Sequence, residues 1–437
     1  MTTAPSPPPS DDSSRRANRD DALAVVRRLR DAGHIAYFAG GCVRDQLLGL
    51  EPKDYDVATD APPDRVRQLF SNTQAVGAAF GVILVRQRRS QIEVATFRTD
   101  GKYVDGRRPQ GVVFTTAEED AKRRDFTING MFYDPIEDRV IDYVGGQDDL
   151  KTQLLRAIGV PDERFEEDHL RMLRAVRFAS RHGFAIEPAT TAGIKAHAEQ
   201  LKRISPERVA EELRHIITRL SKGVAWQMLW DLDLMPVILR HLPERHERPD
   251  PVGPIFPFLA DRVEVPFGLA LAAMALCYRA TGREDIGPLL ERHEVQRTVQ
   301  ALRTGLKISN EEAELVAECT QLSSLLGPTP PTVAMMKRFL AKPHAREARE
   351  MLWALELSVP AYEQRLEWLD EQFKDLLRSD IAPPPLVTGD DLTAAGMKPG
   401  PVFKRVLDAV YDAQLEDRVR TKQDALQLAL ELAQLSS

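Results

Sequence analysis

The sequence predicts an α+β fold, in which a small mixed sheet near the N-terminus is followed by helices to the end of the chain. Two observations predict it. Between residues 34 and 99, short apolar runs bounded by turn residues are typical of strands. From about residue 146 onward, apolar residues recur at helical spacing. A chain of 437 residues can bury several cores, so we expect more than one domain.

Each element of the N-terminal module follows from its local pattern. The segment 21–33 has apolar residues at helical spacing and ends on Gly33, which is typical of a helix C-terminus. The stretch 81–99 splits into two strands around the polar sequence RQRRSQ, so we expect a hairpin there. We expect further strands at 34–41 and 54–60, and helices at 43–49 and 61–70.

Composition shifts mark the segments that connect or flank these elements. The first 20 residues are rich in Pro and Ser, lack an apolar targeting segment, and predict a disordered tail. The longest apolar run, 266–278, is too short to span a bilayer, so we expect a buried helix and no membrane partner. In the helical part we expect loops at 161–169, 245–254, 327–332 and 379–391.

The charge of the chain is nearly balanced, with 59 Lys and Arg against 66 Asp and Glu and a formal net charge of -7. Any polyanion must therefore bind a locally basic surface. Residues 86–125 carry ten Lys and Arg against seven Asp and Glu, and residues 151–220 carry thirteen against ten. The positive charge thus lies in the first half of the chain.

The three cysteines Cys42, Cys277 and Cys319 form no CxxC pattern. Their number and spacing argue against a disulfide framework and against a zinc site. A reducing compartment fits this usage, and we expect a soluble cytoplasmic protein.

Two aspartates in the second predicted strand suggest a metal site. Asp54 and Asp56 are two residues apart, so in a strand both side chains would point to one face, with Cα atoms about 7 Å apart. Carboxylates together with substrate phosphates suit Mg²⁺. A solvent-facing turn is the alternative for this short pattern alone. Glu93, predicted on a neighbouring strand among buried residues, adds a third acid that suits two-metal phosphoryl transfer.

The glycine pair Gly40 and Gly41 ends the first predicted strand and enters a helix. Backbone N–H groups without a neighbouring Cβ can approach a phosphate closely. A glycine pair alone is usually just a turn. Arg44 and the two aspartates at a fixed distance make a phosphate site the more specific interpretation.

Six motifs in order resemble those of class II nucleotidyltransferases, the family of CCA-adding tRNA nucleotidyltransferases and bacterial poly(A) polymerases. They are GGCVRDQLLG (40–49), KDYDVAT (53–59), RRDFTINGMFYD (123–134), GGQDDL (145–150), RFEEDHLRMLRAVRFASRHGF (164–184) and ISPERVAEEL (204–213). The resemblance is strong over residues 25–245 and weaker up to residue 416. It implies a nucleotidyltransferase head with a Mg²⁺ site, followed by all-helical neck, body and tail domains. We accordingly expect the disordered N-terminal tail at 1–20, the head at 21–145, the neck at 146–220, the body at 221–380 and a tRNA-binding tail domain at 381–437.

Asp168 and Arg171 are the predicted base-reading pair. Three residues apart on one helix, they would share a face. A carboxylate accepts from an exocyclic amino group while a guanidinium donates to the adjacent ring acceptor, and cytosine and adenine both present that edge. A surface salt bridge between the two is the alternative. The resemblance assigns the matching pair to base recognition.

The remaining candidates come mainly from the resemblance. It places Arg174 and Arg177 in the nucleotide pocket and identifies Arg124 as nucleotide-binding. Asp125 and Asn129 offer an acceptor and an amide that can test a ribose 2′-hydroxyl, although both residue types also cap turns. We expect Arg208 to support the pocket by pairing with a nearby acid, and we note Gly130 where the family usually has alanine.

The function expected from this resemblance is untemplated addition of C and A to a tRNA 3′ end from CTP and ATP, with release of pyrophosphate. Cys277 and Tyr278 stand where some relatives carry a metal-binding His-Asp pair, so we expect no attached phosphohydrolase. We also expect no long basic C-terminal extension like that of some poly(A) polymerases, which favours tRNA as substrate. The alternatives are a poly(A) polymerase, an enzyme that adds only CC or only A, and a non-catalytic RNA-binding protein.

Overall fold

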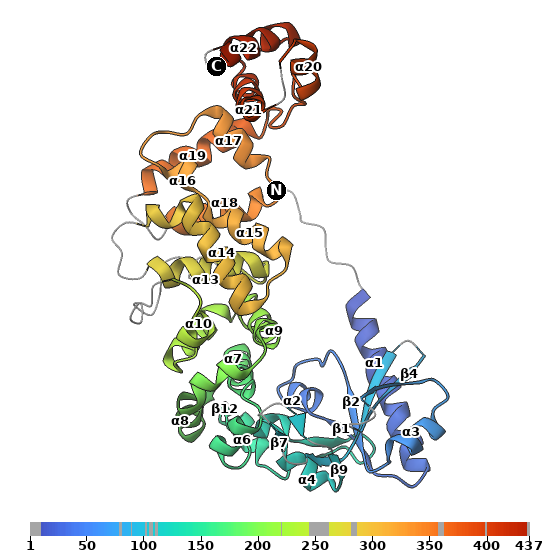
Figure 1. The fold of residues 1–437 in the computed structure, drawn as a ribbon. Coiled ribbons are helices and arrows are strands. Elements are labelled where there is room, and N and C mark those ends of the chain that lie inside the picture. Colours follow the sequence, from blue (N-terminus) through green and yellow to red (C-terminus); the bar gives the residue numbers. More distant parts are fainter. Residues whose placement is uncertain are drawn as a thin grey trace, which may run out of the picture. The chain divides into compact units, whose positions relative to one another are not determined.

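The computed structural model describes residues 10–77, 81–88, 90–100, 103–104, 108–109, 112–219, 221–243, 262–280, 286–356, 362–397 and 400–434 (Figure 1). The chain divides into two compact units, Met1–Ile216 with Met228–Ile238 and Ile217–Gln227 with Leu239–Ser437. The first unit contains a mixed sheet, and the second is built from helices, which confirms the α+β class.

A seven-stranded sheet forms the centre of the head, with the strand order β11-β10-β1-β2-β5-β4-β3. Within it β2 and β5 run parallel, and the other neighbouring strands run antiparallel. The antiparallel pairing of β4 with β5 confirms the predicted hairpin. The strands are β1 (Ala36–Ala39), β2 (Asp56–Thr59), β3 (Thr73–Gly77), β4 (Val82–Gln87), β5 (Ser90–Thr96), β10 (Phe132–Asp134) and β11 (Arg139–Ile141). Two smaller pairs follow β5, namely β6 (Arg98–Asp100) with β9 (Val112–Phe114) and β7 (Tyr103–Val104) with β8 (Arg108–Pro109).

The helices of the head cover the sheet and connect its strands. They are α1 (Ser10–Asp31), α2 (Gly41–Leu47), α3 (Pro63–Leu69), α4 (Ala117–Lys122), the 3₁₀ turn η2 (Thr127–Asn129) and α5 (Gly146–Lys151). Helix α1 packs against β1, β2 and β5, and an ion pair between Arg30 and the buried Asp134 fastens it there. Residues of α4 join an apolar cluster with Ala39, Ala58 and Phe132, so this cluster fixes α4 to the sheet.

The N-terminal tail predicted through residue 20 is wrong for residues 10–20, because α1 begins at Ser10. The chain has no Pro or Gly between Pro9 and Gly33, so nothing in the sequence interrupts the helix before its end. The prediction for residues 1–9 lies outside the described residues.

The loop predicted at 161–169 is also wrong over most of its length, because α6 spans Pro161–Glu167. Proline fits the first turn of a helix, where its missing N–H costs nothing. Phe165 is completely buried and anchors this short helix. The loop predicted at 245–254 lies outside the described residues.

Helices make up nearly all of the rest of the first unit. After α6 come α7 (Arg171–His182), α8 (Pro188–His197), the 3₁₀ turn η3 (Ala198–Arg203), α9 (Pro206–Ile217), α10 (Lys222–Asp231) and α11 (Met235–Ile238), of which α10 crosses the boundary between the units. A two-residue parallel pair, β12 (Leu154–Leu155) with β13 (Ala185–Ile186), interrupts the helical pattern.

The second unit is helical, and its predicted buried helix is confirmed. Helix α13 (Phe267–Ala280) is buried over nearly its whole length and packs against α15 (Asn310–Thr320). None of the helices in the described part of the chain combines the length and apolar character that crossing a membrane requires. The other elements are η4 (Gly287–Leu290), α14 (Arg292–Leu306), α16 (Ser323–Leu326), α17 (Val333–Leu340), α18 (Ala345–Glu356), α19 (Glu363–Leu376), α20 (Gly389–Ala394), α21 (Pro401–Leu415) and α22 (Lys422–Gln434).

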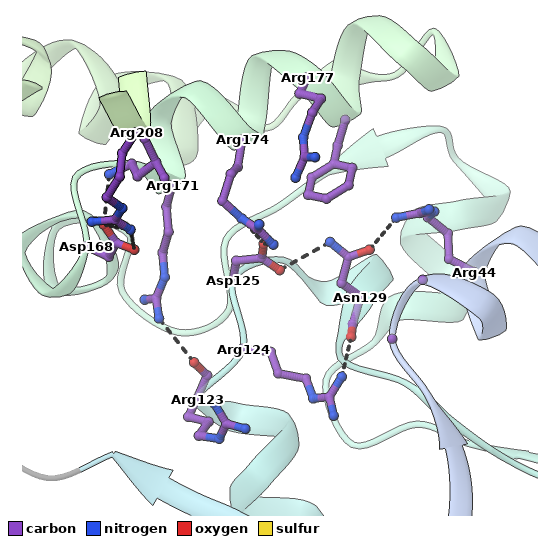
Figure 2. Close-up of a pocket in the computed structure, with 14 residues that line it drawn as sticks. Arg44, Arg123, Arg124, Asp125, Asn129, Asp168, Arg171, Arg174, Arg177 and Arg208 are labelled. Atoms are coloured by element: carbon purple, nitrogen blue, oxygen red, sulfur yellow. Dashed lines mark hydrogen bonds and ion pairs between the residues drawn. The ribbon is translucent and has the colours of Figure 1, made fainter. Parts of the chain in front are cut away.

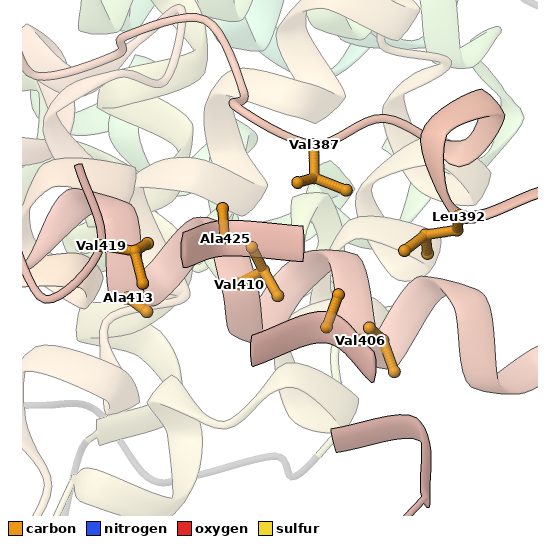
Figure 3. Close-up of a cluster of buried hydrophobic side chains, with 8 residues drawn as sticks. Val387, Leu392, Val406, Val410, Ala413, Val419 and Ala425 are labelled. Carbon is orange, nitrogen blue, oxygen red and sulfur yellow. The ribbon is translucent and has the colours of Figure 1, made fainter. Parts of the chain in front are cut away.

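The last three helices share a small apolar core (Figure 3). It consists of Val387, Leu392, Val406, Val410, Ala413, Val419, Ala425 and Ala429. Because α20, α21 and α22 each contribute to it, these helices pack as one C-terminal cluster.

All three cysteines are buried and carry thiols. Burial raises the pKa of Cys42 to about 12, with the negative charge of Asp56 acting in the same direction. Burial also raises the pKa of Cys319 well above its usual value. The structure therefore agrees with a protein that carries no disulfide.

The first residue of α5, Gly146, has no room for a side chain. Asp142 accepts hydrogen bonds from four successive backbone N–H groups, those of residues 144–147, and so caps this helix. At Gly146 an added Cβ would lie 2.3 Å from the Thr127 carbonyl oxygen, a backbone atom. At Gly130 it would lie 2.7 Å from Val144 Cγ2, so an alanine there would require Val144 to shift.

We predict that Gly146→Ala destabilises the protein by about 3 kcal/mol, because the added methyl group forces α5 and η2 apart. Urea unfolding followed by circular dichroism measures this. Gly145→Asn is the matched control, since Gly145 has φ +79°, open space around it, and a backbone that asparagine tolerates. Equal stability of the two variants would contradict the close packing of α5 on η2.

Candidate functional site

A cavity of about 550 Å³ opens between the head and the helices that follow it in the first unit (Figure 2). Its walls come from the glycine turn before α2, the segment around η2, the turn between α6 and α7, α7 itself and α9. The lining residues are Gly40, Gly41, Arg44, Arg123, Arg124, Asp125, Asn129, Asp168, Leu170, Arg171, Arg174, Arg177, Phe178 and Arg208. All ten residues that the sequence suggested for nucleotide binding therefore lie around one cavity.

The cavity is strongly basic. Seven of its lining residues are arginines and two are aspartates, so the described lining carries an excess of five positive charges. Such an excess in a concave site attracts polyanions and suits a triphosphate.

The glycine turn takes a shape that other residues do not adopt easily. Gly40 has φ 72° and ψ -125° and precedes α2. This backbone conformation favours glycine, and an added Cβ would lie 3.2 Å from Arg124 Nη1, so the guanidinium would have to shift slightly. The Gly40 N–H donates to the Met131 carbonyl oxygen and is therefore not free to bind a ligand. The first backbone N–H groups of α2 have no partner within the helix, so they are the backbone donors at the glycine turn.

A chain of hydrogen bonds links α2 to α7 across the cavity (Figure 2). Arg44 Nη1 donates to Asn129 Oδ1 at 2.6 Å, and Asn129 Nδ2 donates to Asp125 Oδ1 at 3.2 Å. Arg174 donates to Asp125 Oδ2 through Nε at 2.9 Å and Nη2 at 2.6 Å. The amide of Asn129 thus bridges a buried acid and a buried arginine, and it does not cap the turn in which it lies.

Burial alone would raise the pKa of Asp125, but the Arg174 guanidinium outweighs it and lowers the pKa below its usual value. Hydrogen bonds from Asn129 and from the Phe126 N–H act in the same direction. Arg174 responds with a raised pKa, mainly because of Asp125. This pair therefore stays ionised and joins the head to α7.

Asp120 organises the arginines on the head side. Its Oδ1 accepts from Arg123 Nε at 3.0 Å, and its Oδ2 accepts from Arg124 Nη2 at 2.9 Å. The backbone N–H of Arg98 adds a third donor at 3.2 Å. Burial favours the neutral acid, yet the two guanidinium groups prevail and lower the pKa of Asp120. Arg124 is thereby held with its Nη1 against the Asn129 carbonyl oxygen.

The prediction that Asp168 and Arg171 share one helix is wrong. Asp168 follows the last residue of α6 as its C-cap, and α7 begins at Arg171, because the chain turns between the two helices. The salt bridge between them, the simpler alternative, does not form either. Asp168 Oδ2 accepts from Arg208 Nη2 at 3.0 Å, which gives Arg208 the supporting contact expected of it. Arg171 Nη1 instead donates to Glu167 Oε2 at 2.6 Å.

Arg171 also connects two parts of the site. Its Nη1 donates to the Arg164 carbonyl oxygen at 3.1 Å, and its Nη2 donates to the Arg123 carbonyl oxygen at 3.3 Å. A guanidinium has five N–H donors, so two remain beyond these three contacts for a bound molecule. Asp168 likewise keeps acceptor sites beyond its bonds to Arg208 and the Leu170 N–H.

The three acids suggested for a metal site lie outside the lining of the cavity, and their placement corrects two expectations. Asp56 is the first residue of β2, but Asp54 precedes the strand and lies outside the sheet. Glu93 lies on the exposed face of β5, where side chains alternate in burial, and is not buried. Val57 pairs with Val94 in the parallel ladder, so Asp56 and Glu93 are aligned on the same face.

These carboxylates lie close enough to influence one another. Loss of hydration raises the pKa of Asp56 to about 6, and Glu93 and Asp54 add to the rise while Arg124 opposes it. Asp56 as a whole retains exposed surface. The loss of hydration therefore comes from protein atoms packed close to its carboxyl group. In the described part of the chain, no three His, Cys, Asp or Glu side chains form a ready-made metal site.

Sequence reasoning missed Phe178 as a lining residue. The centroid of its ring lies 4.7 Å from the guanidinium carbon of Arg177, 5.2 Å from that of Arg44 and 5.4 Å from that of Arg174. Phe178 thus gives three arginines a shared aromatic surface. The single aromatic residue within the arginine series of this helix was the available signal. The sequence analysis also did not predict Arg123 and Leu170 as lining residues of the cavity. Each of them stands directly beside a residue that it did predict, Arg124 and Arg171 respectively.

Comparison with known proteins finds similar sequences along most of the chain. The family "Poly A polymerase head domain" matches residues 36–156, and "Probable RNA and SrmB-binding site of polymerase A" matches residues 183–245. A CCA-adding enzyme of Geobacillus kaustophilus is 32% identical over 412 residues, covering 93% of this chain and 95% of the relative. Poly(A) polymerase I of Escherichia coli O6:H1 is 40% identical over 251 residues, covering 54% of each chain.

One solved structure is similar to this chain over almost its whole length. The crystal structure of the Bacillus stearothermophilus CCA-adding enzyme in complex with CTP superposes with a TM-score of 0.71 at 28% identity, covering 95% of this chain and 98% of that one.

We predict that Asp125→Asn lowers stability by about 3 kcal/mol at pH 7, because it leaves the Arg174 guanidinium without its charged partner. The folded pKa of Asp125 is depressed, so its contribution is present above the unfolded pKa of about 3.9 and is lost as pH falls through the folded value. Urea unfolding of both proteins from pH 7 down to acid should show the difference shrinking below about pH 4. Asp148→Asn, at an exposed carboxylate on α5, is the control. A difference that stays constant with pH would contradict this role.

Proposed function

The chain belongs to the class II nucleotidyltransferase family, and from this premise we infer that it adds C and A to the 3′ end of tRNA from CTP and ATP, releasing pyrophosphate. The observation that carries the proposal is the similarity to a CCA-adding enzyme along almost the whole chain. The basic cavity fits a nucleoside triphosphate in volume and charge. The cytoplasmic location expected from the sequence is part of the same proposal.

The triphosphate is proposed to bind where the arginines converge. Arg44, Arg124, Arg174 and Arg177 surround the cavity with charged donors, and the first amides of α2 add backbone donors. Asp125 and Asn129 hold Arg44 and Arg174 in place. Asn129 keeps hydrogen-bonding capacity for a ribose 2′-hydroxyl, whereas the acceptor sites of Asp125 are occupied by the Phe126 N–H, Asn129 and Arg174.

The base is proposed to meet Asp168 and Arg171. The carboxylate would accept from the amino group of cytosine or adenine, and the remaining guanidinium donors would reach the adjacent ring nitrogen or carbonyl. Uracil and guanine present the opposite arrangement, so both protein groups would lose their partners. Arg208 and Glu167 fix the two reading side chains before a nucleotide arrives.

The acids on the sheet fit a divalent cation. Asp54 and Asp56 supply two carboxylates, which together with phosphate oxygens are ligands that Mg²⁺ prefers. Burial is the main cause of the raised pKa of Asp56, and Glu93 and Asp54 add a repulsion that a bound cation would relieve. Mg²⁺ bound there would activate the tRNA 3′-hydroxyl and neutralise the charge that develops on the phosphates. Glu93, aligned with Asp56, would orient that hydroxyl.

Three alternatives have different products. A poly(A) polymerase would extend A tracts on many RNAs, a partial enzyme would add only CC or only A, and a non-catalytic protein would bind RNA without extending it. The similarity to poly(A) polymerase covers about half of the chain, which favours CCA addition. Product choice is expected to depend on the segment 98–120, which lies partly outside the described residues. Incubation with tRNA lacking CCA, lacking only A, or complete, with each nucleotide separately, tests all four functions.

We predict that Asp54→Ala and Asp56→Ala each lower incorporation of CMP and AMP more than a hundredfold. Loss of an outer-shell partner of a metal ligand costs about ten- to a hundredfold, and loss of the ligand itself costs more. Single-turnover incorporation into tRNA measures the rate, and a filter-binding assay should show unchanged tRNA affinity. Substantial activity of either variant with Mg²⁺ would contradict the site.

We predict that Asp168→Ala relaxes discrimination against UTP and GTP by about ten- to a hundredfold while the overall rate falls, because a hydrogen bond to a charged group is lost. Ratios of kcat/KM for the four nucleotides measure the effect. Asp162→Ala, which removes an exposed carboxylate on α6, is the control. An unchanged preference for CTP and ATP would show that Asp168 serves only to pair with Arg208.

A further inference from the structure

Arg44 lines the cavity although only 4% of its surface is exposed. A guanidinium buried to this extent is costly unless polar or charged partners surround it. Its Nε and Nη2 donate to Asp45 Oδ1 at 2.8 and 2.6 Å, and its Nη1 donates to Asn129 Oδ1 (Figure 2). These three bonds leave two of the five N–H donors of Arg44, one on each terminal nitrogen, for a phosphate group.

The pair of Arg44 and Asp45 joins two successive residues of α2. Successive side chains of a helix point about 100° apart and do not face each other. The long Arg44 side chain can therefore reach Asp45 in only a few of its conformations, and the two hydrogen bonds select among these. Because an arginine has many conformations to lose, this selection before binding lowers the ordering cost of holding a nucleotide.

Asp45 contacts Arg44 from outside the cavity. The residue is 8% exposed, and the described residues that line the cavity do not include it. Its second oxygen, Oδ2, lies 3.9 Å from Nη2 of the half-exposed Arg181 in the last turn of α7. Asp45 can therefore act on a bound nucleotide in two ways, through Arg44 or through its own negative charge.

The two effects have opposite signs. A carboxylate near a triphosphate repels it, so charge alone predicts that loss of Asp45 strengthens nucleotide binding. Loss of the two bonds to Arg44 predicts weaker binding. We propose that Asp45 is a positioning residue that fixes Arg44 for the triphosphate, and that this effect exceeds its repulsion. The inference rests on the proposed function, because the triphosphate site belongs to that reaction.

Two variants of Asp45 remove the same charge and differ in hydrogen bonding. Asp45→Asn keeps the shape and one oxygen that can still accept from Arg44, whereas Asp45→Ala keeps no acceptor. A difference between the two variants therefore measures positioning and not charge. Glu166→Gln removes an exposed carboxylate of α6 and is the control for net charge.

The first measurement is the affinity for CTP with Mg²⁺ and without tRNA, by isothermal titration calorimetry well below the melting temperature of each variant. We expect Asp45→Ala to weaken CTP binding by about five- to thirtyfold, the range set by the side-chain entropy of one arginine. Asp45→Asn should weaken it by about two- to fivefold because an acceptor remains, and Glu166→Gln should match the wild type. In turnover with tRNA, KM for CTP should rise by the same factors while kcat stays near the wild-type value.

A double mutant shows whether Asp45 acts through Arg44. In an Arg44→Ala background only the repulsion of Asp45 is left, so Asp45→Ala should there leave CTP binding unchanged or strengthen it. Equal losses with and without Arg44 would overturn the proposal.

The single variants provide the other decisive outcomes. CTP binding of wild-type strength or tighter in Asp45→Asn would overturn the positioning role, and this variant decides the matter even if Asp45→Ala does not fold. Weakened CTP binding in a protein whose wild type adds neither CMP nor AMP to tRNA would support the positioning role and refute the proposed function. Incorporation of both nucleotides by the wild type, with an unchanged KM for CTP in the variants, would refute the positioning role alone.

Discussion

The ion pair between Asp125 and Arg174 is the interaction on which the site depends. It joins the segment before η2 to α7, and through Asn129 it reaches Arg44 on α2. Burial favours the neutral form of Asp125, and the Arg174 guanidinium, together with hydrogen bonds from Asn129 and the Phe126 N–H, lowers its pKa below the usual value. Two parts of the first unit that would otherwise meet across a cavity of like charges are thereby held at a fixed separation.

Without a ligand, the arginines that line the cavity repel one another. Carboxylates that contact these arginines from outside the cavity offset the repulsion. Asp120 holds Arg123 and Arg124, Glu167 holds Arg171, and Glu212 lies 3.1 Å from Arg177. These acids contact the arginine side chains, and Asp120, Glu167 and Glu212 do not line the cavity. The positive surface is therefore arranged before a nucleotide binds, which lowers the cost of ordering on binding.

The sequence predicted what depends on local pattern and failed where geometry depends on distant contacts. The hairpin of β4 and β5 and the buried helix α13 follow from periodicity alone. By contrast, the partner of Asp168 is an arginine 40 positions later, which spacing along one helix cannot reveal. Asp54 was placed on a strand because alternation continues through Tyr55, although the ladder begins only at Asp56. The start of α1 at Ser10 was not predicted. The Pro- and Ser-rich composition of the first 20 residues suggested a disordered tail, although no Pro or Gly follows Pro9 before Gly33.

The burial of all three cysteines has a practical consequence for attaching dyes to this protein. Thiol-directed dyes react with thiolates, and burial keeps Cys42 and Cys319 protonated at ordinary pH. A cysteine introduced on an exposed position of each unit would therefore be labelled ahead of the native ones. Energy transfer between two such dyes could then report the distance between the units in a single molecule while it works through successive nucleotide additions.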